Sequence, residues 1–172
     1  MARGLVTAEL KGLKEFVKEM EQLVGDFPEI SREALSAQEQ VVESAIRQNW
    51  ISRGGKAGDF IYDSVGHSTA FSKLNPVDVV GTVGVYNIDS VAAAHDKTSK
   101  DLNAAQIAYW VEFGTSRIRG GGRKVRGVEY SEEQLISITP VPFISNAFYS
   151  SIEAQEKAFI ERFNQLADQI MR

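Results

Sequence analysis

The chain has 172 residues, of which 43% are hydrophobic, 24% charged and 9% aromatic, a composition that excludes intrinsic disorder of the whole chain. No apolar run reaches the roughly 20 residues of a membrane-spanning helix, and the lack of cysteine excludes disulfides, thiolate nucleophiles and cysteine-based zinc sites. The formal net charge of −4 excludes nucleic-acid binding over the whole surface, so any contact with phosphates must be local.

The amino-terminal third of the chain is predicted to be helical. Apolar side chains recur every three or four positions over residues 9–24, which is the spacing of one helix face. We expect Gly25 to end this helix and Asp26 and Pro28 to open a second one, because aspartate caps helix starts and proline suits the first turn. The second apolar stripe continues to Trp50. The pattern therefore predicts a helical hairpin, or one long helix broken near Gly25.

The middle of the chain predicts a small sheet and a short helix. Residues 51–59 contain three glycines and predict a flexible loop, whereas residues 60–71 fit either a strand or a loop. Valines alternate with polar residues over residues 77–86, the pattern of a half-buried strand. Residues 104–113 return to helical spacing, and Gly114 is predicted to end that helix.

The remainder of the chain predicts an arm followed by a long helix. Residues 115–137 are polar, basic and rich in glycine, which favours an exposed loop or a mobile hairpin arm that ends at Pro140 and Pro142. One long carboxy-terminal helix follows. The expected fold is thus α+β in a single domain, 1–172, with amino-terminal helices, a small mostly antiparallel sheet, a long final helix and an exposed basic arm over residues 116–139.

Residue counts argue against most enzyme classes. The chain has only two histidines, His67 and His95, too few to expect a converging set of metal ligands. Neither a G-x-S-x-G motif nor a histidine near a plausible serine nucleophile is evident, so acyl transfer has no support. Gly54-Gly55-Lys56 is similar to part of a phosphate loop, but alanine follows where a magnesium-binding hydroxyl is needed. We expect no enzyme activity, no metal and no cofactor.

Glu112 is the acidic residue with the least ordinary surroundings, since it lies in the aromatic stretch Tyr109-Trp110-Val111-Glu112-Phe113. A carboxyl group among aromatic rings can have a raised pKa and donate a proton. The alternative, which we favour, is that Glu112 pairs with an arginine or caps neighbouring backbone. No second carboxylate stands at a fixed spacing from it, so catalysis is not supported.

A basic cluster without any acidic residue marks the predicted arm. Its side chains can bind the phosphates of passing DNA, or dock on an acidic patch of a partner protein or of a second copy, or remain solvated. We favour protein contact. The candidate interaction residues are Arg117, Arg119, Arg123, Lys124 and Arg126.

Two motifs then give a family resemblance. The stretch 108–116 reads A-Y-W-V-E-F-G-T-S, and the stretch 142–147 reads P-F-I-S-N-A. Together they resemble the signature of the tailed-phage neck family, the tail-completion or head–tail joining proteins of lambdoid and related phages. The structural motif residues are Tyr109, Trp110, Glu112, Phe113, Gly114, Thr115, Pro142 and Phe143.

These motifs make physical sense without catalysis. We expect Gly114 to end the helix in a left-handed turn that a side chain would resist. We expect Pro142 to fix the first turn of the terminal helix, and Phe143 to pack back on Phe113 or Trp110. Both ends of the arm would then be attached firmly to the core.

The resemblance implies a structural protein of the virion neck that completes the tail and joins it to the DNA-filled head as part of a ring-like connector. Its implied partners are copies of itself in a ring and other neck, portal-adaptor and tail-tube or terminator proteins. Non-specific contact with DNA in the channel stays open, and no membrane is involved. The implied location is the head–tail neck, after assembly in the host cytoplasm.

Three alternative functions compete with this one. A tail terminator ring capping the tail tube shares the expected size and α+β character. A hydrolase acting through Glu112 lacks partner residues. A DNA-binding regulator would need a recognition helix, whereas the positive cluster lies in a glycine-rich segment.

Overall fold

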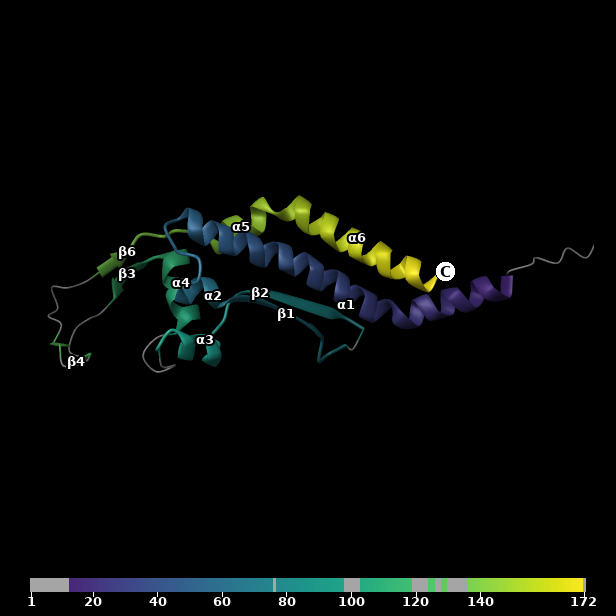
Figure 1. The fold of residues 1–172 in the computed structure, drawn as a ribbon, viewed down its shortest axis with the longest axis horizontal. Helices are drawn as coiled ribbons and strands as arrows, with labels where there is room; N and C mark the ends of the chain where they lie inside the picture. The colour runs from purple at the N-terminus through teal and green to yellow at the C-terminus, as the bar shows by residue number, and fades with distance from the viewer. Residues whose placement is uncertain are drawn as a thin grey trace, which may run out of the picture.

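The computed structural model describes residues 13–75, 77–97, 103–118, 124–125, 128–129 and 136–171. The molecule is elongated, and its two longest helices run along the long axis (Figure 1). The long helix α1 (Leu13–Ser52) lies between a two-stranded sheet on one side and the last two helices on the other. The fold is α+β with a small antiparallel sheet and a long carboxy-terminal helix, as predicted.

Helix α1 is continuous over 40 residues and contains both Gly25 and Pro28. The predicted break near Gly25 is therefore wrong. Proline removes one backbone donor from a helix interior, a local cost that packing on both sides of the site can offset. Here Phe27 packs edge-on against Phe163 of the last helix with ring centroids 5.7 Å apart, and Ile30 is buried one turn later. Tertiary packing thus outweighs the local stop signals.

The segment 60–71, which was ambiguous from sequence, forms helix α2 (Phe60–Asp63) followed by strand β1 (Val65–Phe71). Asp59 caps α2 by accepting the backbone N–H of Tyr62 at 2.8 Å, and it also accepts the indole N–H of Trp50 at 2.8 Å. Burial raises the pKa of Asp59, but these bonds outweigh it and leave the pKa lowered.

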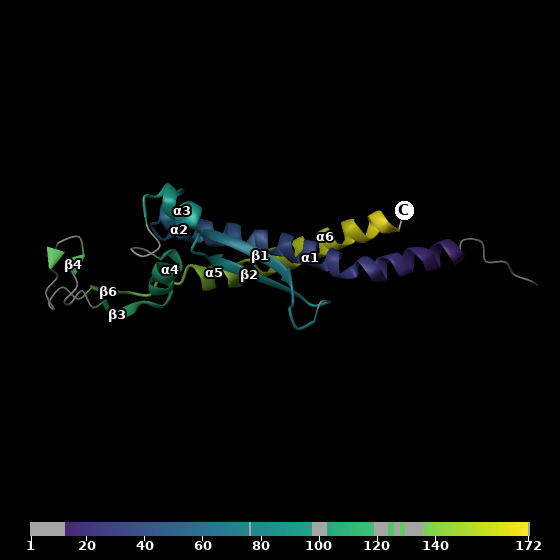
Figure 2. The same ribbon diagram turned by 90° about the horizontal axis from the view of Figure 1, so that it is seen from below.

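The predicted valine-rich strand is confirmed as β2 (Val79–Val85). Strands β1 and β2 pair antiparallel, with Val65 opposite Val85 and Phe71 opposite Val79. The sheet packs against the carboxy-terminal half of α1 (Figure 2).

Two helices lie between the sheet and the arm, and two more follow the arm. Helix α3 (Asp89–Ala94) precedes α4 (Ala104–Phe113), which confirms the helix predicted over 104–113. The single terminal helix that we expected is divided into α5 (Ile144–Ser150) and α6 (Ile152–Ile170).

The arm begins and ends in paired strands. Strand β3 (Thr115–Ile118) pairs antiparallel with β6 (Ile136–Ile138), and β4 (Lys124–Val125) pairs with β5 (Val128–Glu129). The hairpin interpretation therefore holds for the described strands. They lie at the end of the molecule opposite the amino terminus of α1 (Figure 1).

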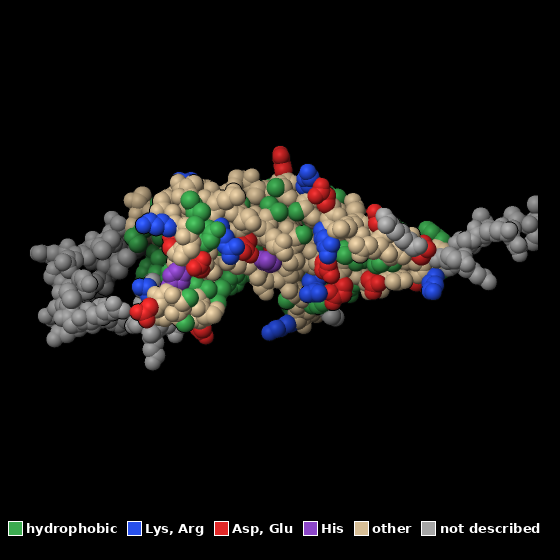
Figure 3. Space-filling model, in the orientation of Figure 1, with side chains coloured by type: hydrophobic (Ala, Val, Ile, Leu, Met, Phe, Trp, Pro, Cys, Tyr) green, Lys and Arg blue, Asp and Glu red, His purple; other side chains and the backbone are tan. Residues whose placement is uncertain are grey.

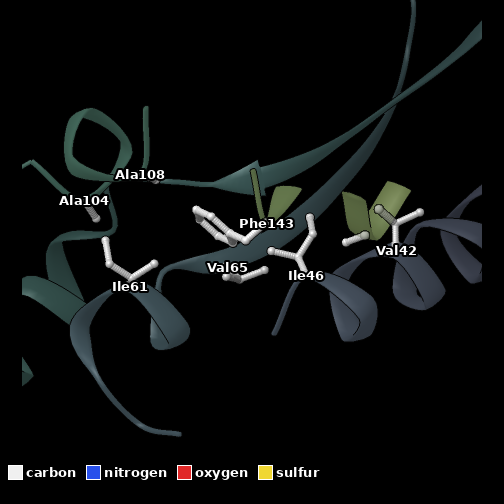
Figure 4. Close-up of a cluster of buried hydrophobic side chains, with 8 residues drawn as sticks. Val42, Ile46, Ile61, Val65, Ala104, Ala108 and Phe143 are labelled. Carbon is white, nitrogen blue, oxygen red and sulfur yellow. The ribbon is translucent and has the colours of Figure 1, made fainter. Parts of the chain in front are cut away.

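The core sits where the carboxy-terminal half of α1 meets β1, α4 and α5 (Figure 4). Within the described residues no helix has the length and apolar character needed to cross a membrane. The buried core cluster consists of Val42, Ile46, Ile61, Val65, Ala104, Ala108, Phe143 and Ala147.

Candidate functional site

Glu112 holds the two sequence motifs together. Its Oε2 accepts the backbone N–H groups of Phe143 at 2.8 Å and Ile144 at 2.9 Å, while its Oε1 accepts the backbone N–H of Ser145 at 2.9 Å. The Ser145 hydroxyl donates to the same Oε1. Glu112 therefore caps α5, whose own capping residue contributes no side-chain bond. We call Glu112, Phe143, Ile144 and Ser145 the Glu112 clamp.

The clamp determines the protonation state of Glu112, a residue that is only 4% exposed. Burial raises the pKa of the carboxyl group, but the bonds from the Ser145 hydroxyl and from the three backbone N–H groups outweigh it, so the pKa is lowered. The interpretation of Glu112 as a proton donor with a raised pKa is thus wrong. The interpretation that it caps neighbouring backbone is confirmed.

Two more bonds fasten the chain around the clamp. The backbone N–H of Val141 donates to the carbonyl of Val111 at 2.7 Å, which attaches the segment before α5 to the last turn of α4. The amide of Asn49 donates to the carbonyl of Phe143 at 3.2 Å, which attaches the same segment to α1. The end of the arm is therefore held by two helices.

Phe143 packs on a different partner from the one predicted. Its ring is fully buried and lies 5.0 Å, centroid to centroid, from that of Trp50 on α1. Phe113 is 62% exposed and lies 4.9 Å from the ring of Tyr109. The expected packing of Phe143 on Phe113 is therefore wrong, and Trp110 lies outside the described core cluster.

Helical spacing explains this correction. Helix α4 buries Ala104, Ala108 and Glu112, three positions each four residues apart, so Tyr109 and Phe113 fall on the exposed side. Pro142 also differs from expectation, because α5 begins two residues after it. Pro142 thus precedes the capping position rather than fixing the first helical turn.

Gly114 occupies a conformation that requires glycine. Its φ of 73° and ψ of 172° are an extended backbone with positive φ, rather than the left-handed helical turn that we predicted. A Cβ here would meet the Ile138 carbonyl oxygen and the Pro140 ring at 2.8 Å. The need for glycine is confirmed, and its cause includes this close approach of the end of the arm.

Gly114→Ala is expected to lower the free energy of unfolding by at least about 2 kcal/mol, because strain from positive φ adds to a clash with backbone. Gly25→Ala is the matched control, since Gly25 lies in the interior of α1 with no atom within 4 Å of a Cβ. The control should stabilise the chain by about 1 kcal/mol. Urea unfolding followed by circular dichroism measures both, and equal effects would contradict the geometry at Gly114.

The basic interaction residues have only partly described positions. Arg117 lies in β3 and Lys124 in β4, whereas Arg119, Arg123 and Arg126 lie outside the described residues. The side chain of Thr115 also lies outside them. Their contacts remain predictions.

A polar network that the sequence analysis missed joins α1 to β1. His67 Nε2 lies 3.4 Å from Ser36 Oγ, and His67 Nδ1 lies 2.5 Å from a carboxylate oxygen of Glu43. The other oxygen of Glu43 lies 2.6 Å from Arg47, which also donates to the Val65 carbonyl at 2.8 Å. This proximity of a histidine to a serine was not evident from the sequence.

The order serine–histidine–carboxylate resembles that of serine hydrolases, but the surroundings favour a structural role. Ser36 lies inside α1, where backbone N–H groups bond within the helix and cannot stabilise an oxyanion. Glu43 also forms an ion pair with Arg47, so its carboxylate does not serve His67 alone. Spacings of three and four residues place Ser36, Glu39, Glu43 and Arg47 on one helix face, a sequence signal that indicates polar contact with another element.

The second histidine is also structural. His95 Nε2 lies 2.8 Å from an Asp63 carboxylate oxygen, and its ring lies 5.8 Å from that of Phe60, so it fastens the end of α3 to α2. Figure 3 shows the histidines in purple beside acidic side chains in red. Among the described residues no group of three or more His, Cys, Asp or Glu side chains could hold a metal ion.

Comparison with protein-family models, curated proteins and solved structures finds no match. Within the structure, the Glu112 clamp joins the two motifs, and the close approach at Gly114 brings the first motif against Ile138 and Pro140.

Proposed function

We propose that this chain is a structural protein of the tailed-phage neck, which completes the tail and joins it to the DNA-filled head as part of a ring-like connector. One observation carries the proposal: the glutamate of the first motif is bonded to the backbone of the second motif through the Glu112 clamp. Because this contact stabilises the fold, it supports a structural role for the residues of both motifs.

The surface also supports a role in assembly. Large apolar side chains are exposed next to one another near the start of α1, among them Phe16 at 56%, Val17 at 46% and Val24 at 70%. A contiguous exposed apolar patch is typical of a surface that a partner covers. The proposed partners are further copies of the chain and the neighbouring neck, portal-adaptor and tail-tube or terminator proteins.

The basic residues of the arm are the proposed polar part of these contacts. Arg117, Arg119, Arg123, Lys124 and Arg126 would meet acidic patches on a neighbouring subunit, with non-specific contact to channel DNA as the alternative. The proposed location is the head–tail neck of the virion.

A hydrolase acting through Glu112 is not supported. The lowered pKa keeps the carboxylate ionised, and its two oxygens already accept four hydrogen bonds. The tail terminator stays a candidate, because it would use the same kind of fold and surface.

Deletion of the gene from its phage, followed by electron microscopy of lysates, tests the proposal. We expect filled heads and separate finished tails of normal length, and we expect the wild-type gene supplied in trans to restore joined particles. Tails of uncontrolled length would assign the terminator function instead. Joined, infectious particles without the gene would overturn the proposal.

The same complementation tests the serine–histidine–carboxylate network. Because Ser36 lacks oxyanion donors within its own helix, a Ser36→Ala allele is expected to complement fully. A folded Ser36→Ala protein that fails to complement would indicate nucleophilic chemistry at Ser36.

A further inference from the structure

The two edges of the β1–β2 sheet differ in how they are protected. Along β1, Arg47 donates to the Val65 carbonyl at 2.8 Å, and the guanidinium of Arg32 lies 5.8 Å from the centre of the Phe71 ring. Charged side chains beside an edge strand hinder its pairing with another chain. Strand β2 contains no charged residue and no proline, and it pairs with β1 in one unbroken register. Its outer edge therefore has none of the usual protection against a further strand.

The hydrogen bonds at the two ends of the sheet show which backbone groups of β2 point outward. At one end the N–H of Ser72 donates to the Asp78 carbonyl at 2.7 Å, and at the other the N–H of Tyr86 donates to the Ser64 carbonyl at 2.8 Å. Bonded and non-bonded pairs alternate along an antiparallel ladder, so the even-numbered residues bond between β1 and β2. The odd-numbered residues of β2 direct their backbone groups away from β1. Within the described part of the chain, these groups have no hydrogen-bond partner at Val79, Gly81 and Val83.

The sequence of β2 is complementary to an antiparallel copy of itself. Its seven residues read V-V-G-T-V-G-V, with Thr82 at the centre. A two-fold axis at Thr82 places Val80 of each copy opposite Gly84 of the other, and Gly81 opposite Val83. These pairs set a valine against a glycine, and two threonines, which pair well across strands, meet at the axis. The register also joins odd-numbered residues to odd-numbered residues, as bonding between their outward groups requires.

The rest of the molecule leaves room for this contact. Helices α5 and α6 lie on the side of α1 that faces away from the sheet (Figure 1). A helix is about 10 Å wide and strands lie about 4.8 Å apart, so two copies side by side would give four strands covered by two helices. Sheets of two strands are marginally stable, and further strands stabilise them. The acidic residue next to β2, Asp78, would lie opposite Tyr86 of the other copy, so like charges stay apart.

We infer that β2 pairs antiparallel with β2 of a second copy of this chain, about a two-fold axis at Thr82, and so forms a four-stranded sheet. Backbone hydrogen bonds supply the affinity of such a contact, and side-chain register supplies its specificity. The contact is isologous, because both copies use the same strand. It goes beyond the proposed neck function and does not depend on it, since a ring uses heterologous surfaces.

Sedimentation velocity of the full chain over a concentration series tests the inference. We expect the wild type to dimerise, and we expect Thr82→Lys and Thr82→Glu each to weaken dimerisation at least about tenfold, because like charges meet at the axis. An equimolar mixture of the two variants should restore the dimer, since lysine then faces glutamate. Ser68→Lys is the matched control: Ser68 is also exposed and lies opposite Thr82 on β1, away from the contact, so dimerisation should be unchanged.

Hydrogen exchange of the wild type, followed by NMR, gives a readout that needs no variant. The amides of Val79, Gly81 and Val83 should be protected at concentrations where the chain is dimeric and should exchange rapidly where it is monomeric, because only the dimer provides them with acceptors. The even-numbered amides of β2 should stay protected in both states, since they bond to β1.

Four results would overturn the inference. They are a wild type that stays monomeric throughout, a Thr82→Lys variant that dimerises as the wild type does, a mixture of the two folded variants that stays monomeric, and outward amides that exchange rapidly in the dimer. Circular dichroism establishes that the variants fold. Gene deletion tests the neck function separately, so either proposal can fail while the other stands.

Discussion

Phe143→Ala is expected to lower the free energy of unfolding by about 3–5 kcal/mol, the range for removing a large aromatic side chain from a packed core. Phe143 is fully buried and packs on Trp50 at a centroid distance of 5.0 Å. Its backbone N–H also donates to Glu112, so repacking around a cavity would disturb the cap of α5. Urea unfolding followed by circular dichroism and tryptophan fluorescence measures the loss.

Phe148→Ala provides the matched control for this variant. Phe148 lies in the same helix α5, but its side chain is 46% exposed, so the same truncation should cost under about 1.5 kcal/mol. Equal losses in the two variants would contradict the central position of Phe143 in the core.

Local sequence signals predicted an element correctly where its capping residues and apolar pattern agree with the tertiary contacts around it. Strand β2 follows its alternating valines. Helix α4 is capped at its start by Asn103, whose side chain accepts the N–H of Gln106 at 2.9 Å, and at its end by Gly114. The same kind of signal failed at Gly25 and Pro28, because the stabilising contact comes from Phe163, far along the sequence. Local propensity is a weak determinant once a helix face is packed.

The division between α5 and α6 had no signal in the apolar pattern. The chain turns at Ser151, whose hydroxyl donates to the Ala147 carbonyl at 2.7 Å. The buried amide of Gln155 then donates to the Phe148 carbonyl at 2.8 Å, so side chains satisfy backbone groups freed by the break. Serine and glutamine are ordinary residues within helices, which is why the sequence predicted one helix.

The sequence predicted the capping role of Glu112 but not which residues it contacts. The favoured interpretation that Glu112 caps backbone is confirmed, but the helix that it caps lies 31 to 33 residues away in sequence. The contact of Ser36 with His67 likewise depends on where β1 lies on α1. Contacts of this kind follow from tertiary register, which a single sequence does not specify.

Glu112→Gln is expected to lower the free energy of unfolding at pH 7 by about 3 kcal/mol. The amide keeps one acceptor oxygen and places an NH₂ group where the second oxygen was, so at least one buried backbone N–H loses its acceptor. Each such loss costs about 1–3 kcal/mol, and the remaining bonds lose the assistance of charge. Glu156→Gln, an exposed position on α6, is the isosteric control and should change stability by under about 0.5 kcal/mol.

The loss should depend on pH in a direction set by the Glu112 pKa. Because the folded pKa lies below the ordinary value of 4.5, the unfolded chain binds a proton more readily than the folded chain in acid. The stabilisation from Glu112 is therefore complete above about pH 5 and is lost as the pH falls through the folded pKa. The difference between wild type and Glu112→Gln should narrow over the same range.

Asp59, whose pKa is also lowered, gives both proteins a shared acid dependence, so comparing the two curves isolates Glu112. Urea unfolding at intervals between pH 7 and pH 3 provides these curves. A wild-type advantage that stays constant down to pH 3 would show that the charge of Glu112 does not stabilise the start of α5. A narrowing advantage would instead tie the second motif to the first through an ionised side chain, which is the contact on which the proposed neck function depends.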